Sequence, residues 1–410
     1  MTTDTLLVIA DDLTGANDTA VMFADAGFNT RLEINLASLN TTDFSKADVF
    51  SVSTDSRPLG IEAEIKTEQA ILSGIKKGIA HIYLKIDSTM RGSVQHQING
   101  ALKAWSSLHP EAKAIICPAY PEMGRTIKKG HLHVNEIPVN ETASGKDAIC
   151  PVYSSLMTDL LPNATHLPCL PKDELISEIT SSSSKQIVVD AESDTDLDVI
   201  ASVINQLGNK MIPVGSAGLA QKLKHVKGRD HEEKHSIKSL GRILLVVTSI
   251  HDISQTQVDH YISTIGGDAI VFNPAPSQLI NHQLSEEALK QQLNALITSS
   301  SSNVIIRANP AKVINTDESI NEIARKIAKY LADLAKYALD SKQFDSLILF
   351  GGDGAAALLE KMDITELQVL YAIVPGVPLC EIDSGSYQGI KVMTKSGGFG
   401  NITLLNDIIG

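Results

Sequence analysis

Short apolar runs alternate with amphipathic segments along the first half of the chain. Four of these runs are rich in Leu, Ile and Val, and they cover residues 6–10, 49–52, 81–86 and 114–117. Each has the length and the unbroken apolar character of a strand that is buried on both faces of a parallel sheet. Residues 61–79, between two of the runs, have the spacing of an amphipathic helix. This rhythm predicts an α/β fold in which crossover helices join parallel strands.

The alternation continues in the second half of the chain. Further strands are expected at residues 186–190, 211–214, 242–248, 269–272, 304–307, 346–350 and 390–393. A charged segment with few large apolar residues, 222–240, interrupts the pattern and is the expected domain boundary. The sequence therefore predicts two α/β domains with mostly parallel sheets, residues 1–230 and 240–410, and an active site in the cleft between them. In such folds ligands lie at the carboxyl ends of the strands.

A long polar stretch, residues 121–151, carries several Gly and Pro residues and shows little periodicity. A loop of this length inside a compact domain is usually functional or disordered. His131 and His133 form an H-x-H pair within it. No third ligand follows at an obvious spacing, so we expect no metal site there.

The charge of the chain excludes one class of partner. Among 410 residues there are 35 Lys and Arg and 48 Asp and Glu, which gives a net charge of −13 at pH 7. So acidic a chain lacks the positive field on which nonspecific nucleic-acid binding relies, although a local basic pocket can still hold a small anion.

Cysteine spacing and hydropathy indicate the compartment. The four cysteines lie far apart without a C-x-x-C pair, as expected for reduced thiols. The first apolar run stops at an acidic pair and has no basic region before it, so it reads as a buried strand and not as a signal peptide. No run of about 18 apolar residues is present. We therefore expect a cytoplasmic protein without a membrane partner.

The first predicted strand ends in two adjacent acidic residues, Asp11 and Asp12. Adjacent residues on a strand point to opposite faces, so the two carboxylates are expected to have different roles. The structural alternative is that both cap a helix that begins near Asn17. A phosphatase of the D-x-D type is disfavoured, because its two carboxylates are separated by one residue and these two are neighbours.

Basic side chains follow the next two strands: Arg57 follows one, and Lys85 and Arg91 follow the other. Arg presents a planar fork that matches a carboxylate or a phosphate, and Lys presents a compact cation. Three cations at strand ends of an acidic chain, beside hydroxyl and carboxylate groups, indicate a small anionic ligand that carries hydroxyls. The alternative is a set of surface cations that pair with Asp55 and Asp87.

Two glycine-rich turns follow strands in the second half of the chain. Gly351–Gly354 precedes a helix that is expected from residue 355, and Gly397 and Gly398 lie in a second turn of the same kind. Glycine lets backbone N–H groups approach phosphates closely, so two such turns indicate a nucleotide phosphate site. Another strand end adds the hydroxyl of Ser249.

The two common nucleotide motifs fit poorly. Residues 352–357 match G-x-G-x-x-A, but a dehydrogenase also needs an acidic residue about 20 positions later to hold the ribose. The only candidate, Glu381, lies 29 positions after Gly352. The P-loop pattern G-x-x-x-x-G-K-[ST] does not occur in the chain. The nucleotide site is therefore expected to be of a less common type.

Taken together and in order, these motifs closely resemble those of the four-carbon acid sugar kinases. The matching segments span essentially the whole chain: Ile9–Thr19, Thr54–Arg57, Lys85–Gly92, Pro118–Thr126 and Thr394–Gly400. The resemblance implies a sugar-acid domain followed by a nucleotide domain. It also implies ATP-dependent phosphorylation of the terminal hydroxyl of a tetronate such as threonate, erythronate or 3-oxo-tetronate. The first motif looks most like that of the D-threonate 4-kinase branch.

The resemblance assigns residues to both ligands. It implies that the sugar acid is bound by Asp11, Arg57, Lys85, Ile86, Asp87 and Ser88, and Arg91 lies at the same strand end. It implies that ATP, accompanied by Mg²⁺, is bound by Ser249, Gly351, Gly352, Asp353, Gly354, Gly397 and Gly398. The chain departs from the family pattern at residues 247–252, where a small-residue turn is usual, and at Leu13, where Phe is frequent.

The chemistry of phosphoryl transfer completes the hypothesis. We expect Arg57 and Lys85 to clamp the substrate carboxylate, and Asp11 to act as the general base with Asp87 as the alternative. A non-catalytic sensor of a sugar acid and a nucleotide would need the same pockets, so it remains the competing class. A homodimer is the expected assembly, because dimers are the most common oligomers.

Overall fold

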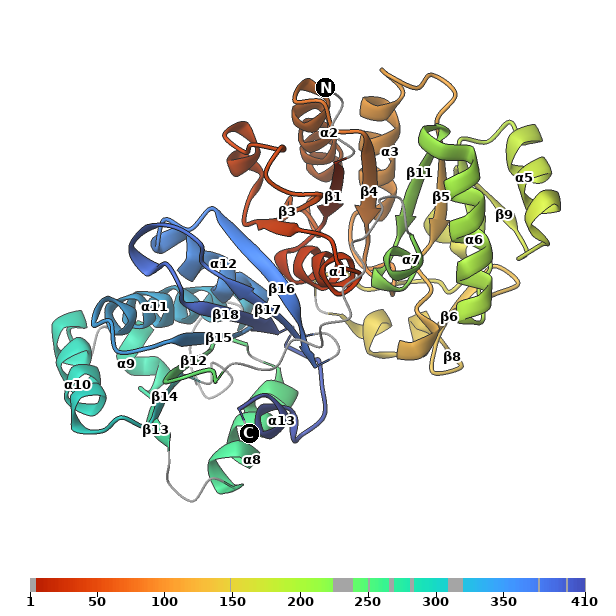
Figure 1. The fold of residues 1–410 in the computed structure, drawn as a ribbon. Coiled ribbons are helices and arrows are strands. Elements are labelled where there is room, and N and C mark those ends of the chain that lie inside the picture. Colours follow the sequence, from red (N-terminus) through yellow and green to blue (C-terminus); the bar gives the residue numbers. More distant parts are fainter. Residues whose placement is uncertain are drawn as a thin grey trace. The chain divides into compact units, whose positions relative to one another are not determined.

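The computed structural model describes residues 5–147, 149–223, 239–249, 251–264, 269–280, 284–308, 320–374, 377–395 and 397–409. The chain forms two compact units, residues 1–231 and 232–410, and each has its own hydrophobic core. Strands and helices alternate in both, which confirms the predicted α/β fold (Figure 1). Most of the predicted boundary segment 222–240 lies outside the described residues.

The first unit is built on a parallel sheet. In spatial order its described strands are β2 (Thr30–Glu33), β3 (Val49–Ser53), β1 (Leu6–Ala10), β4 (His81–Lys85), β11 (Met211–Gly215), β5 (Lys113–Cys117), β10 (Gln186–Val189) and β9 (Ala164–Leu167). Every neighbouring pair is parallel. All residues of β1, β3 and β11 are buried, as their apolar runs predicted.

Helices lie on both faces of this sheet, because right-handed crossovers that step in opposite directions place their helices on opposite faces. On one face α7 (Ala217–Lys222) packs between α1 (Leu13–Asp25) and α6 (Asp194–Leu207). On the other face α2 (Ile61–Lys76) packs along α3 (Val94–Trp105) (Figure 1). The remaining α-helices described in this unit are α4 (Met157–Leu160) and α5 (Lys172–Ser181).

The polar stretch 121–151 is folded over most of its length. It contains a small antiparallel sheet of β6 (Arg125–Lys128), β7 (His131–Val134) and β8 (Ile137–Pro138), flanked by short 3-10 turns. The sequence predicted a functional or disordered loop. It missed the strands because segments of four residues or fewer show too little alternation to be recognised.

The second unit has a mixed sheet. In spatial order its described strands are β13 (Ala269–Phe272), β14 (Asn303–Arg307), β12 (Ile243–Val247), β15 (Ser346–Phe350), β18 (Lys391–Lys395), β17 (Val377–Glu381) and β16 (Glu366–Val374). The first five strands are parallel, and β17 runs antiparallel to both of its neighbours. The described helices are α8 (Asp252–Thr264), α9 (Pro276–Ile280), α10 (Glu286–Ser299), α11 (Ile320–Asp340), α12 (Gly352–Lys361) and α13 (Leu404–Ile409).

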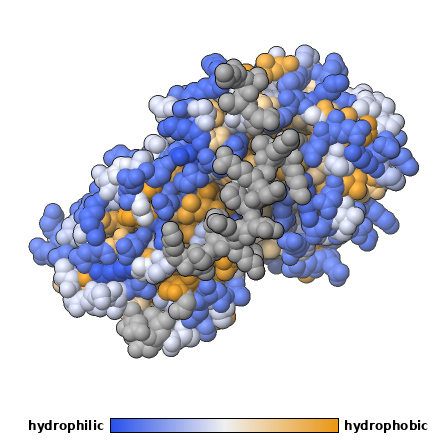
Figure 2. Space-filling view, viewed as in Figure 1, coloured by the Kyte–Doolittle hydropathy of each residue, from blue (hydrophilic) through white to orange (hydrophobic). Residues whose placement is uncertain are grey.

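Each strand predicted from an apolar run exists, with ends within two residues of the prediction. The missed strands include β2 and β9, which are only four residues long and mix polar with apolar positions. Hydrophilic residues cover most of the surface in view, and hydrophobic residues form small groups on it (Figure 2). Within the described ranges, no helix combines the length and the apolar character that crossing a membrane requires.

Candidate functional site

The carboxyl ends of β1, β3 and β4 lie side by side in the first unit, because β1 pairs in parallel with both neighbours. Ala10 at the end of β1 is level with Ser53 of β3 on one side and with Lys85 of β4 on the other. Polar residues that follow these strand ends therefore meet, although they are distant in the sequence. They form a cluster of three carboxylates and three basic side chains, which we call the charged cluster: Asp11, Asp12, Arg57, Lys85, Asp87 and Arg91.

Arg57 is the centre of this charged cluster. Its Nε donates to Oδ2 of Asp11 at 2.5 Å. Its Nη2 lies 3.0 Å from Oδ2 of Asp12 and 3.7 Å from Oδ2 of Asp87. Burial by itself would lower the pKa of the guanidinium, but the three carboxylates hold it well above the ordinary value. Arg57 therefore stays charged, and it pairs with the strand-end carboxylates as well as with Asp87, the partner that the alternative interpretation expected.

Asp11 is a buried carboxylate that can accept a further hydrogen bond. Its side chain is 1% exposed. Its Oδ1 is buried and has no hydrogen-bond partner within the part of the chain that the structure describes. Burial raises the pKa of this carboxyl, the charge of Arg57 opposes the rise, and the charge of Asp12 adds to it. A buried carboxylate with one unpaired oxygen can accept a hydrogen bond or a proton from a ligand hydroxyl.

Asp12 lies on the same side as its neighbour, because both carboxylates contact Arg57, so the expectation that the two point to opposite faces is wrong. Both residues follow the end of β1 at Ala10, where strand alternation no longer applies. Asp12 is the N-cap residue of α1, where its Oδ1 accepts a hydrogen bond from N of Gly15 at 2.7 Å. The helix begins at Leu13, so the alternative interpretation, in which both aspartates cap a helix that starts near Asn17, is wrong. The sequence could have predicted this N-cap, because an Asp at the N-cap commonly accepts a hydrogen bond from the N–H of the third residue after it.

Asp87, the alternative base, is saturated with donors. Its Oδ1 accepts from N and Oγ1 of Thr89 and from Nε of Arg91, and its Oδ2 accepts from Nη2 of Arg91 at 2.6 Å. Burial would raise the pKa of Asp87, but Arg91 and Arg57 hold it well below the ordinary value. A carboxylate held so firmly in its charged form is a poor proton acceptor and a good anchor. Arg91 also contacts Oδ2 of Asp147 at 3.3 Å.

The other predicted substrate residues lie at the same strand end. Lys85 is 5% exposed, and its Nζ donates to O of Ile86 at 2.9 Å. Its charge acts against the burial that raises the pKa of Asp11. Ile86 is fully buried, and its N–H donates to O of Gly215 at 2.9 Å, so it fixes the loop rather than presenting a side chain. Ser88 is half-buried.

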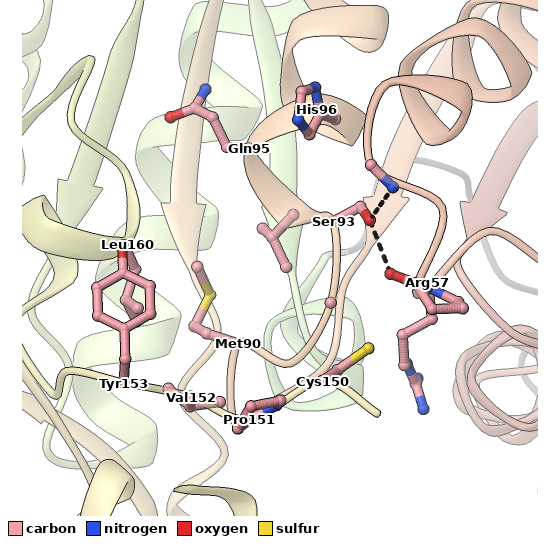
Figure 3. Close-up of a pocket in the computed structure, with 14 residues that line it drawn as sticks. Arg57, Met90, Ser93, Gln95, His96, Cys150, Pro151, Val152, Tyr153 and Leu160 are labelled. Carbon is pink, nitrogen blue, oxygen red and sulfur yellow. Dashed lines mark hydrogen bonds between the residues drawn. The ribbon is translucent and has the colours of Figure 1, made fainter. Parts of the chain in front are cut away.

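Arg57 also lines a cavity of about 340 Å³ in the first unit (Figure 3). Oγ of Ser93 holds one wall, because it donates to O of Arg57 at 2.8 Å and accepts from N of Gly60 at 2.7 Å. In Figure 3 the guanidinium points away from the labelled side chains of Gln95 and His96. Arg57 therefore presents its backbone to this cavity and its guanidinium to the charged cluster.

Three strand ends meet in the second unit in the same manner. β15 pairs in parallel with β12 on one side and with β18 on the other. N of Ser249 donates to O of Phe350 at 2.9 Å, and N of Gly351 donates to O of Lys395 at 3.0 Å. The predicted nucleotide segments are therefore neighbours in space, and we call them together the glycine cradle: Ser249, Gly351–Gly354 and Gly397–Gly398.

Side chains would not fit without displacement at three glycines of the cradle, Gly351, Gly354 and Gly397. A Cβ on Gly351 would lie 2.7 Å from Oγ1 of Thr248, and one on Gly354 would overlap the same side chain. A Cβ on Gly397 would overlap the hydroxyl of Ser249. Gly351 also has φ of +113°, a conformation that favours glycine. Bare backbone at adjoining strand ends is the form of a phosphate-binding site.

The structure corrects one boundary in the cradle. Gly352–Gly354 form the first turn of α12, whereas the sequence predicted a turn before a helix from residue 355. Their N–H groups therefore belong to the N-terminus of a ten-residue helix, which favours anions. The side chain of Asp353 and the whole of Ser396 lie outside the described residues.

The sequence analysis missed three residues that contribute contacts to these two sites: Asp12, Asp147 and Lys395. Asp12 pairs with Arg57, and the only sign of this in the sequence was that Asp12 is an acidic neighbour of Asp11. Asp147 lies in the polar stretch, where no pattern singles it out. Lys395 stands directly before the second glycine turn, and that position was the available signal. Among the described residues, no three His, Cys, Asp or Glu side chains are grouped to hold a metal ion.

Two protein-family models match the chain. Residues 6–223 match a model described as a sugar-binding N-terminal domain, and residues 244–405 match a model described as a nucleotide-binding C-terminal domain. A D-threonate kinase of Bordetella bronchiseptica is 30% identical over 413 residues, which cover 97% of this chain and 95% of that protein. A D-erythronate kinase of Heliobacterium modesticaldum is 26% identical over 424 residues, which cover 97% and 94% of the two chains.

Solved structures resemble the chain over almost its whole length. A Bordetella bronchiseptica structure with bound citrate, described as a domain-swapped dimer, is 30% identical and covers 98% of this chain and 96% of its own, with a TM-score of 0.51. A Salmonella typhimurium structure reaches a TM-score of 0.81 at 21% identity and covers 98% of both chains. The second likeness shows the fold alone.

Proposed function

Because the chain belongs to the four-carbon acid sugar kinase family, we propose that it transfers the terminal phosphoryl group of ATP to the 4-hydroxyl of a four-carbon sugar acid. One observation carries the proposal. The unit that matches the sugar-binding model has the charged cluster around Arg57, and the unit that matches the nucleotide-binding model has the glycine cradle. D-threonate is the proposed substrate, supported by the first motif and by the 30% identical D-threonate kinase. D-erythronate and 3-oxo-tetronate are the alternatives.

In the proposed complex Arg57 and Lys85 hold the carboxylate of the sugar acid. They follow β3 and end β4, on either side of β1, so that their charges can converge on one small anion. Arg57 is a planar donor that stays charged, and Lys85 is a buried point charge. Asp87 and Asp12 hold the guanidinium in place, since both lie within 4 Å of its Nη2.

Asp11 is the proposed base, in preference to Asp87. Its Oδ1 is buried without a hydrogen-bond partner in the described part of the chain, and its pKa is raised by burial. The oxygens of Asp87 are occupied by Thr89 and Arg91, and its pKa is lowered well below the ordinary value. Asp11 would take the proton of the 4-hydroxyl while that oxygen bonds to the phosphorus and the bond from the phosphorus to the ADP oxygen breaks.

The residues of the second unit would position the phosphates. Phosphoryl transfer gains most from positioning and charge neutralisation. The N–H groups at the start of α12 and in the Gly397–Gly398 turn, with the hydroxyl of Ser249, are the proposed phosphate donors. Mg²⁺ bound with the nucleotide would supply the remaining neutralisation.

A coupled assay of ADP release over D-threonate, D-erythronate and 3-oxo-tetronate tests the proposal, and D-threonate should give the highest kcat/KM. If no acid causes ADP release while both ligands still bind, the protein is a sensor and the kinase proposal fails. A change in NAD(P)H absorbance with the acid alone, without ATP or coupling enzymes, would instead indicate a dehydrogenase.

We also propose a homodimer and a cytoplasmic location. The dimer is supported by the domain-swapped dimer of the Bordetella bronchiseptica structure and by the prevalence of symmetric dimers. The location is supported by the need for ATP as a substrate. Light scattering after size-exclusion chromatography measures the first, and cell fractionation measures the second.

A further inference from the structure

Lys395 is a buried cation at the end of β18, directly before the second glycine turn. Its residue exposure is 1%, and its Nζ lies 4.4 Å from the centre of the Phe350 ring. Its Nζ donates to Oγ of Ser254 at 3.2 Å and to Oε1 of Gln257 at 2.8 Å. It also donates to two carbonyl oxygens of the loop that follows, those of Gly397 at 3.3 Å and Phe399 at 2.9 Å.

The two side chains of α8 that accept from Lys395 bind the same loop. Oγ of Ser254 donates to O of Gly397 at 2.7 Å. Nε2 of Gln257 donates to O of Phe399 at 3.0 Å and to O of Asn401 at 2.8 Å. Alternate carbonyls of residues 397–401 are thus turned toward one buried group of donors, which we call the lysine anchor: Lys395, Ser254 and Gln257.

Peptide geometry fixes what the loop presents on its other side. In a trans peptide the C=O of one residue and the N–H of the next point in opposite directions. Because the carbonyls of Gly397 and Phe399 face the lysine anchor, the N–H groups of Gly398 and Gly400 point away from it. Both of these glycines are exposed. Exposed N–H groups on the same side of one loop can donate hydrogen bonds to an anion.

Within the part of the chain that the structure describes, no ion pair explains the charge of Lys395. The groups that contact its Nζ are two neutral side chains, two carbonyl oxygens and a phenyl ring. Burial lowers the pKa of Lys395 to about 7. The unpaired charge is therefore unfavourable by itself, and a bound polyanion beside the loop would favour it. His251 is one titratable group on the cradle side, and its Nε2 lies 3.1 Å from the position that a Cβ on Gly398 would take.

We propose that Lys395 is a positioning residue for the phosphates of the nucleotide. With Ser254 and Gln257 it holds the carbonyls of Gly397, Phe399 and Asn401 inward, so that the N–H groups of Gly398 and Gly400 face the phosphates. This inference rests on the proposed function of the second unit as the ATP site. It adds to the glycine cradle a support that reaches no ligand directly.

The test is the binding of ADP to the full-length protein, measured by isothermal titration calorimetry. Lys395→Met removes the charge and all donors while it keeps the length of the side chain, and it should weaken ADP binding about tenfold or more. In steady state it should raise the KM for ATP and leave the KM for the sugar acid unchanged. Lys391→Met is the matched control, because Lys391 lies on the same strand and its Nζ donates to O of Ser239 away from the loop.

Two milder variants keep the test decisive if Lys395→Met fails to fold. Ser254→Ala and Gln257→Leu each remove contacts to the loop while they leave the lysine in place, and each should weaken ADP binding by a smaller factor. Wild-type ADP affinity in a folded Lys395→Met, or in both milder variants, would overturn the inference. An equal loss of sugar-acid affinity would also overturn it, because it would show a general loss of structure.

Failure of the kinase proposal gives a different result. A wild-type protein that binds ADP but phosphorylates no tetronate would refute the kinase, and the variants would still decide the role of Lys395. A wild-type protein that does not bind ADP would refute both.

Discussion

Nε of Arg57 donates to Oδ2 of Asp11 at 2.5 Å, although the two residues are 46 positions apart in the sequence. The bond occupies one oxygen of the carboxylate and leaves the other, Oδ1, buried and without a hydrogen-bond partner in the described part of the chain. One arginine therefore orients the group that we propose as the base, and in the proposed complex the same arginine also holds the substrate carboxylate. Substrate affinity and turnover should consequently respond differently to mutation of the two residues.

Arg57→Ala should raise the KM for the sugar acid by about tenfold to a hundredfold, the usual effect of losing a charge-assisted hydrogen bond. It should also lower the free energy of unfolding by up to about 3 kcal/mol, because Asp11 and Asp87 lose a charged partner. Steady-state kinetics and urea unfolding measure the two effects. Lys103→Ala is the control, since Lys103 forms an exposed pair with Glu68 in the same unit. An unchanged KM for the sugar acid would remove Arg57 from the substrate site.

Asp11→Asn should reduce kcat by about 10²–10⁴-fold, the usual contribution of a general base. The fold should survive, because burial already disfavours the charged form and the amide has the same shape. Since burial raises the pKa of Asp11 above 3.8, the acidic limb of the kcat/KM profile should lie above that pH. The limb should disappear in the variant.

Asp12→Asn is the control for this substitution, because an amide oxygen can keep the N-cap hydrogen bond to Gly15. Its kcat should stay much closer to that of the wild type. A loss of kcat below about tenfold in Asp11→Asn would be too small for a base and would return the role to another group.

The sequence predicted the residues at the strand ends well, but it did not predict the side chains that hold those residues and the following loops in place. Asp11 and Arg57 could be placed together because buried parallel strands leave apolar runs whose ends meet at one edge of the sheet. Lys395 could not be connected to Gln257, because 138 positions separate them and the contact depends on how α8 packs against β18. The contact of Arg91 with Asp147 bridges 56 positions and begins in a stretch without periodicity. Local pattern predicts elements, but contacts between irregular segments depend on tertiary packing.

Asp87→Asn should destabilise the first unit in a pH-dependent manner. Burial would raise the pKa of Asp87, but Arg91 and Arg57 hold it well below 3.8. A carboxylate with a lowered pKa contributes stability that is complete above its ordinary pKa and is lost as the pH falls through the folded-state value. The variant should be about 2 kcal/mol less stable at neutral pH, and the difference should shrink as the pH falls below 3.8. Urea unfolding over this range measures it, and a difference that does not change with pH would contradict the assignment.

Gly354→Ala should weaken nucleotide binding and leave the KM for the sugar acid unchanged. Gly354 is buried in the first turn of α12, where a Cβ would overlap the side chain of Thr248. Either the helix start or the end of β12 must therefore move. Ser249 and Gly351 would move as well, because Ser249 follows Thr248 and Gly351 precedes α12. The N–H of Ser249 is also hydrogen-bonded to O of Phe350, and that of Gly351 to O of Lys395. A displacement of about 1 Å is enough to cost up to about 10²-fold in positioning, so the KM for ATP should rise at least about tenfold.

Gly100→Ala separates this effect from a loss of stability. Gly100 lies in α3 of the first unit, where a Cβ would overlap the backbone carbonyl of Glu64. The control variant should therefore have a lower melting temperature but bind ADP as the wild type does. Equal weakening of ADP binding in both variants would attribute the effect to instability. A wild-type KM for ATP in Gly354→Ala would mean that the nucleotide phosphates do not bind at the start of α12.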